Sequence, residues 1–249
     1  MSQDPRISLR LVHAKPGVGA VTGQQEPDRA TGTVVDRFTG TIAPADPRWP
    51  GVTAIGGCLV FVTIMAALHF IQPELNPITT FGSHYALGKM GWLMNLGSLA
   101  FATAVAALAL ASARMQDSSR AGSILLGCSA FGLLIGGLFN VDPLGAQPTP
   151  SGRVHLVGGL LTFLCMIPAA ILLSRALSVA GRLRGWYWVL PGLSWLAALV
   201  FLANLSVLEA LGLPGLGNRL FLAIMSAWLL TAGQGVRTNG FARLNAPET

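Results

Sequence analysis

Long apolar runs separated by short polar connections dominate the chain from about residue 52 onward. A helix needs about 20 apolar residues to cross the hydrocarbon core of a bilayer, and each of these runs approaches or exceeds that length. Because lipid offers the backbone no hydrogen-bond partners, such runs are expected to be helical. The pattern predicts six spans, at about residues 52–71, 86–111, 121–139, 153–174, 186–208 and 219–236.

The polar residues divide the chain into three parts. Residues 1–50 carry eleven of the 26 charged side chains and are rich in Gly, Pro and Thr, so they cannot bury enough apolar surface to fold alone. We expect a flexible cytoplasmic tail over 1–50, a transmembrane domain over 51–237 and a short cytoplasmic tail over 238–249. The predicted fold class is an all-α polytopic membrane bundle.

Composition and charge support this reading. Only 10% of the residues are charged, against about 25% in soluble domains. Lys and Arg concentrate in both tails and in the connections that follow the second and fourth spans, which predicts that both termini are cytoplasmic. The net charge of +6 reflects this asymmetry. A basic face of the kind that binds nucleic acid is not apparent, and no nucleic-acid partner is expected.

Ionisable and polar side chains collect beside the spans on the predicted outer side. His69 ends the first span, Asp142 follows the third, and His155 opens the fourth. Two histidines and one carboxylate are a common zinc set, and the same groups are suited to proton relay. We therefore expect His69, Asp142 and His155 to converge as a catalytic or metal site, holding zinc or another divalent cation or shuttling protons. Ser83 and Tyr85 would orient a substrate or a water.

A structural explanation competes with this one. Each outer hairpin contains an acid and a base that could pair, namely Glu74 with Lys89, Asp142 with Arg153, and Glu209 with Arg219. Hydrogen bonding within the hairpins would then account for the histidines as well. Glycine stripes below His84 and His155 place both histidines, together with Asn95, toward the bundle interior. No GxSxG, Walker, GxGxxG or CxxC motif is present to choose between these readings.

Two segments resemble a known family. "ALHFIQPELNPITTFGSHYALGKMGWLM" and "GLLIGGLFNVDPLGAQPTPSGRVHLVGG" are similar to the bacterial six-span membrane proteins catalogued as domain of unknown function 998. The matching positions, over residues 52–236, are His69, Pro73, Ser83, Tyr85, Gly88, Asp142 and His155. His84 stands where the family commonly has an acid, and Asn140-Val141 replaces Pro-Thr. The resemblance implies a six-span fold with a polar cluster in a bacterial inner membrane, and no reaction.

A more distant similarity links the chain to the alkaline-ceramidase and adiponectin-receptor group of membrane hydrolases. Those enzymes also gather Ser, Asp and His around zinc near one membrane face. This sequence lacks their His-x-x-x-His pair on the last span, which holds no histidine. The similarity therefore does not extend to an identical zinc site.

The leading functional expectation is a membrane-embedded enzyme, hydrolase-like or transferase-like, acting on a lipid or amphiphilic substrate at the extracytoplasmic face. The alternative from another class is a non-enzymatic accessory or sensor protein of the bilayer, whose outer polar residues only lock the hairpins. A small proton-coupled transporter ranks third, because no charged residue lies deep in a predicted span. The sequence does not indicate an oligomeric state.

Overall fold

The computed structural model describes residues 48–115, 118–180 and 188–244. Within these ranges the chain is helical and contains no β-strand. Six helices are long and apolar enough to cross a membrane: α1 (Trp49–Ile71), α2 (Trp92–Ala113), α3 (Arg120–Leu138), α4 (Pro150–Ala180), α5 (Val189–Ala203), which continues as the π-helix η3 (Asn204–Leu208), and α6 (Pro214–Leu244). The predicted all-α, six-span fold is confirmed, and the protein is a multi-pass membrane protein. The tail predicted over 1–50 lies almost wholly outside the described residues.

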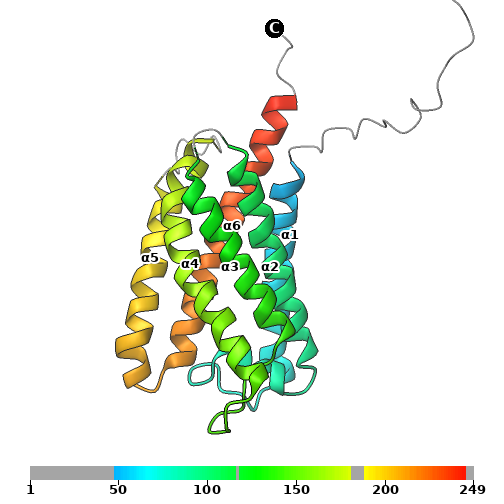
Figure 1. Cartoon of the computed structure of the whole chain (residues 1–249), viewed down its shortest axis with the longest axis vertical. Coiled ribbons are helices and arrows are strands. Elements are labelled where there is room, and N and C mark those ends of the chain that lie inside the picture. Colours follow the sequence, from blue (N-terminus) through cyan, green and yellow to red (C-terminus); the bar gives the residue numbers. More distant parts are fainter. Residues whose placement is uncertain (1–47, 116–117, 181–187, 245–249) are drawn as a thin grey trace, which may run out of the picture. The chain divides into compact units, whose positions relative to one another are not determined.

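Successive helices run antiparallel (Figure 1). Consequently α1 begins and α6 ends at one end of the bundle. The connections 72–91, 139–149 and 209–213 lie at the other end, which we call the loop end (Figure 1). Which end faces the cytoplasm follows from the Lys and Arg asymmetry alone and stays a prediction.

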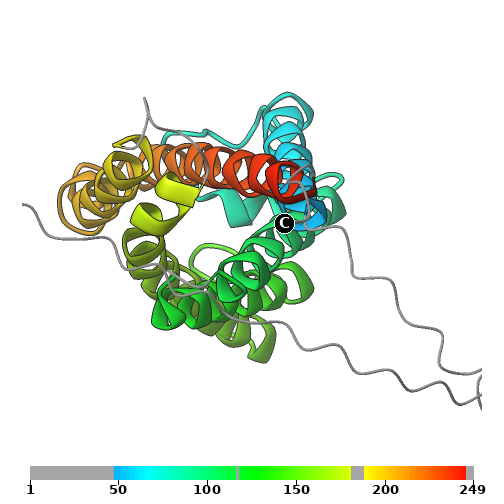
Figure 2. The same cartoon turned by 90° about the horizontal axis from the view of Figure 1, so that it is seen from above.

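The helices form a ring when the bundle is viewed from above (Figure 2). Helices α1 to α4 pack against their sequence neighbours, and α6 closes the ring by packing against α1. Helix α5 packs against α4 and α6 at the edge of the bundle and buries the smallest share of its residues. Its many exposed leucines, such as Leu199 and Leu202, suit a surface that faces lipid.

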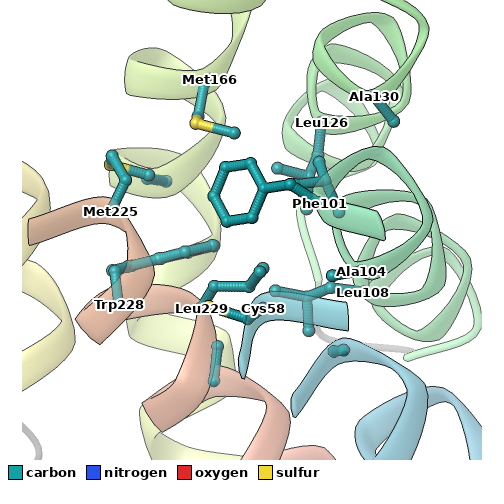
Figure 3. Close-up of a cluster of buried hydrophobic side chains, with 14 of the residues drawn as sticks. Cys58, Phe101, Ala104, Leu108, Leu126, Ala130, Met166, Met225, Trp228 and Leu229 are labelled. Atoms are coloured by element: carbon teal, nitrogen blue, oxygen red, sulfur yellow. The ribbon is translucent and has the colours of Figure 1, made fainter. Parts of the chain in front are cut away.

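Large apolar side chains fill the middle of the ring (Figure 3). Phe101 of α2 points toward Met166 of α4 and toward Met225 and Trp228 of α6. The indole N–H of Trp228 donates to the Ser174 hydroxyl at 2.9 Å, so the buried polar atom of this large side chain is satisfied. The core thus joins helices that are far apart in the sequence.

Small residues let neighbouring helices approach closely, as the sequence predicts. A side chain at Gly132 of α3 would overlap the carbonyl oxygen of Gly158 on α4. At the same contact the Ser129 hydroxyl donates to the Thr162 carbonyl at 3.2 Å. Gly136, one turn away on α3, instead faces the ring of His155. The α3–α4 contact therefore fixes where the first turns of α4 lie.

The start of the second span differs from the prediction. Residues 82–87 form a separate 3-10 helix, η2 (Gly82–Leu87), and α2 begins only at Trp92. A side chain at Gly88 would overlap the amide of Gln72, and one at Gly91 would overlap the Ala86 carbonyl. These glycines therefore serve a tight turn, and His84 does not belong to a continuous stripe on α2.

Candidate functional site

The residues expected to form a site all lie at the loop end. His69 is in the last turns of α1, and Ser83 and Tyr85 are in η2. Asp142 is in the connection between α3 and α4, and His155 lies in the second turn of α4. The side chains nevertheless divide into three separate settings, described in turn below.

His69 belongs to a network with α6. Its Nδ1 donates to the Met65 carbonyl at 2.6 Å, and its Nε2 accepts a hydrogen bond of 3.0 Å from the Nε–H of Arg219. Because a guanidinium can only donate, Nε2 must carry a lone pair and His69 is neutral in this arrangement. Both ring nitrogens are thereby engaged.

Arg219 ties three segments of the loop end together. Its Nη1 donates to the carbonyls of Thr80 and Gly215 at 2.6 and 3.1 Å. Its guanidinium carbon lies 5.4 Å from the centre of the Tyr85 ring, within the range of a cation–π contact. Its Nη2 is buried and has no hydrogen-bond partner among the described residues. Arg219 lies at the beginning of an apolar span, and this position could have pointed to such a network. From the sequence, Arg219 was considered only as an ion-pair partner.

Tyr85 and Gln72 complete this network. Both side chains are fully buried, at 0% exposure. The Tyr85 hydroxyl donates to the Leu75 carbonyl at 3.2 Å, and the Gln72 amide donates to the carbonyls of Tyr85 and Lys89 at 3.0 and 2.7 Å. The Tyr85 ring lies 5.2 Å from that of His69. Tyr85 therefore anchors η2 to the end of α1 and does not present its hydroxyl to a substrate.

The ion pairs of the competing structural explanation are not formed. No ion pair joins Glu74 to Lys89, Asp142 to Arg153, or Glu209 to Arg219, all of which are described residues without such a contact. Glu74, Arg153 and Glu209 are exposed, where an ion pair would add little. Asn95 is partly buried on α2 and forms no side-chain hydrogen bond with the described residues.

Asp142 caps the beginning of α4. Its two carboxylate oxygens accept the backbone N–H of Thr149 at 3.0 Å and the Thr149 hydroxyl at 2.6 Å. Thr149 in turn accepts the N–H of Gly152 at 3.1 Å. These hydrogen bonds, the one from the hydroxyl first, lower the pKa of the Asp142 carboxyl. In the sequence Asp142 follows the C-terminus of α3, where a carboxylate is unfavourable, whereas the folded loop brings it to the favourable N-terminus of α4.

His155 and Ser83 line one cavity. The cavity has a volume of about 140 Å³ and is bordered by α1, η2, α2, α3, α4 and α6. His155, Gly159 and Thr162 all line it, and their spacing in the sequence places them on one face of α4. The Nδ1 of His155 donates to the Phe139 carbonyl at 2.7 Å, which leaves Nε2 as the nitrogen available to a ligand.

His84 lies near this cavity. Its Nδ1 is buried and has no hydrogen-bond partner among the described residues. Burial lowers the pKa of His84 below its ordinary value, and the charge of His155 lowers the same pKa further. His84 is therefore favoured as a neutral imidazole beside His155.

The predicted metal set is not found. Among the described residues no group of three or more His, Cys, Asp or Glu side chains is arranged to hold a metal ion. The hydrogen bonds give the physical reason: Arg219 and Met65 engage His69, and Thr149 engages both oxygens of Asp142. His69, Asp142 and His155 therefore do not form one metal site. His69 bonds to Arg219, Asp142 caps α4, and His155 lines the cavity.

Comparison with known proteins supports the family and adds no activity. No curated protein and no solved structure matches the chain. Residues 55–235, which include parts of all six membrane-spanning helices, match a family whose description assigns no reaction. The chain therefore belongs to the family described as "Protein of unknown function (DUF998)".

Proposed function

We propose that the protein is a membrane-embedded enzyme that admits the end of a small amphiphilic molecule to the cavity and uses His155 to move a proton at its polar group. The observation that carries this proposal is that His155 and Ser83 line the same, otherwise largely apolar, space. A cleft with apolar walls and a few polar groups is the usual form of a small-molecule site.

The hydrogen bonding of His155 suits acid–base chemistry. A carbonyl holds its Nδ1–H, so the orientation and the tautomer of the ring are set, and Nε2 can accept a proton. The Ser83 hydroxyl forms no hydrogen bond with the described residues and is available as a nucleophile or as an orienting group. This pair of groups supports the proposal of a reaction of the hydrolase or transferase type.

The Arg219 network has a supporting role in the proposal. Arg219 and Tyr85 anchor η2, and η2 carries Ser83 to the cavity. Asn218, the neighbour of Arg219, accepts the N–H of Gly82 at 3.1 Å and also lines the cavity. His69, Tyr85 and Arg219 are therefore positioning residues, and Asp142 caps the helix that carries His155.

The size of the cavity limits the substrate. A drug-sized ligand occupies roughly 300–1,000 Å³, and a cavity of about 150 Å³ accepts a molecule such as benzene. At about 140 Å³ the space holds one end of a single chain or a small head group, and it does not hold a whole diacyl lipid. The Lys and Arg asymmetry places the reaction at the extracytoplasmic face.

Conversion of single-chain amphiphiles tests the proposal. The full chain in nanodiscs would be incubated with monoacylglycerols, fatty esters and fatty amides, and the products would be identified by mass spectrometry. His155→Asn should abolish conversion and Ser83→Ala should reduce it, both without changing the melting temperature. Arg153→Ala, an exposed neighbour on α4, is the control and should convert normally.

The same experiment addresses the second candidate, a non-enzymatic accessory or sensor protein. The hydrogen-bond network that locks the loop end favours this candidate, because it needs no chemistry. Binding without conversion of any compound would reject the enzyme and support this alternative. Loss of conversion in proportion to loss of melting temperature would likewise assign His155 a structural role.

A further inference from the structure

We infer that the cavity selects amphiphiles whose polar group is uncharged, such as a hydroxyl, ester or amide, over those with an anionic or cationic head. The inference rests on the proposed function and names its substrate class. Its basis is the chemistry of the wall: among the described residues that line the cavity, none is Asp, Glu, Lys or Arg.

The polar groups at the outer part of the cavity are a hydroxyl, an imidazole and an amide. Ser83 offers a hydroxyl, and His155 offers Nε2 as an acceptor. Asn218 uses its amide oxygen on Gly82, which leaves its N–H groups as donors. Together they provide donors and an acceptor at the place where the polar group of the ligand would lie.

The charged side chains nearby lie outside the wall of the cavity. Arg219 donates through Nε and Nη1 to His69, Thr80 and Gly215, Asp142 accepts from Thr149, and neither residue lines the cavity. Arg153 is exposed and does not line the cavity. A charged ligand head would therefore leave water without gaining a counter-ion, which is far more costly than burying a hydrogen-bonded neutral group.

The inner part of the cavity is aromatic. Phe61 and Phe101 stack with ring centres 4.6 Å apart, and Phe163 lies across the space on α4. The hydroxyl of Thr162, which also lines this part, is already donated to the Gly158 carbonyl at 2.9 Å. The carbons next to the polar group of the ligand fit here, so that the polar group lies toward the loop end and the rest of the chain lies outside a cavity of about 140 Å³.

Binding of a matched series of single-chain compounds tests the inference. The full chain in nanodiscs would be equilibrated with monodecanoylglycerol, decanoate and decyltrimethylammonium, and bound compound would be measured by native mass spectrometry. The measurement is made at about pH 8, where an imidazole is neutral. The neutral compound should bind at least about tenfold more tightly than either charged one.

Two variants separate site binding from partition into lipid. Gly159→Leu fills the cavity, since a side chain at Gly159 meets nothing within 4 Å, and it should remove the specific binding of monodecanoylglycerol. Ser98→Lys places a cation in the wall and should shift the preference toward decanoate. If Ser98→Lys fails to fold, the binding of the three compounds to the unmodified protein still tests the inference.

The outcomes distinguish the inference from the proposed function. Equal or tighter binding of decanoate or decyltrimethylammonium that Gly159→Leu removes would overturn the inference of neutral selectivity and leave the cavity as a binding site. If none of the three compounds shows binding that Gly159→Leu removes, both the proposed function and the inference are rejected.

Discussion

The Nε–H of Arg219 donates to Nε2 of His69 at 3.0 Å, although 150 residues separate them in the sequence. This contact joins the end of α1 to the beginning of α6 and closes the ring of helices at the loop end. No carboxylate pairs with this guanidinium, since its described partners are an imidazole, two carbonyls and an aromatic ring. The polar contacts among α1, η2 and α6 at the loop end are therefore organised around a cation.

Removing this cation should destabilise the protein. Arg219→Ala leaves His69 and the Thr80 carbonyl without their donor, and we expect a loss of about 2–3 kcal/mol, in the upper part of the range for hydrogen bonds to a charged group. For a chain of this size that loss lowers the melting temperature by roughly 4–12 °C. Thermal melts in detergent would measure it, with Arg153→Ala as the exposed control. Equal melting temperatures for the two variants would contradict a structural role for the network.

Alanine substitutions at two glycines of α3 should affect stability differently, because only one of the glycines lies at the contact with α4. Gly132→Ala forces a methyl group against the Gly158 carbonyl and should cost about 1–3 kcal/mol through overpacking. Gly127→Ala meets nothing within 4 Å and should be neutral or stabilising by up to about 1 kcal/mol, because alanine favours a helix. Melting temperatures of the two variants are directly comparable. The reverse order would show that the helices do not approach at Gly132.

His84 should make stability fall in mild acid. Burial first, and then the charge of His155, lowers its folded-state pKa below the unfolded value of about 6.5. Stability is therefore complete above that unfolded value and declines as pH falls through it, because the unfolded chain takes up the proton more readily. Melting temperatures measured at falling pH would show this slope, and His84→Gln should flatten it. A slope unchanged in the variant would assign the effect to another group.

Asp142 should also make stability depend on pH, but through a carboxyl group rather than an imidazole. The hydrogen bonds from Thr149 lower its folded-state pKa, so its contribution is complete above the unfolded value of about 3.9 and is lost as pH falls through the folded pKa. Asp142→Asn should therefore melt below the wild type at neutral pH and approach it in strong acid. Thr149→Val removes the donor hydroxyl and should weaken the same pH dependence, with an additional loss at every pH because the Gly152 N–H also loses its acceptor. A difference that persists in strong acid would mean that the carboxylate charge is not responsible.

The orientation of the bundle can be tested by labelling in a background without native cysteines. Gln147→Cys lies in an exposed connection at the loop end and should react with an impermeant maleimide in intact cells. Ala113→Cys lies at the other end and should react only after permeabilisation. These results would follow from cytoplasmic termini, as the Lys and Arg asymmetry predicts. Labelling in the reverse pattern would invert the proposed face of the site.

The sequence alone determined that the protein has six membrane spans and that three of its four histidines gather at one end. Span number follows from hydropathy because a chain in lipid must be apolar outside and hydrogen-bonded within. The alternation of spans then assigns His69, His84 and His155 to the loop end. The stripe of His155, Gly159 and Thr162 also indicated which face of α4 turns inward, because small residues mark close packing.

Only the tertiary structure decided what each of these residues does. Arg219 reaches His69 because α6 packs against α1, a contact that no local pattern encodes. Asp142 accepts from Thr149 because the loop between α3 and α4 folds back on itself, which reverses the helix end that the carboxylate meets. A hydropathy pattern indicates only whether a position is buried. Hydrogen bonds between distant segments depend on distances that arise only when the ring of helices closes.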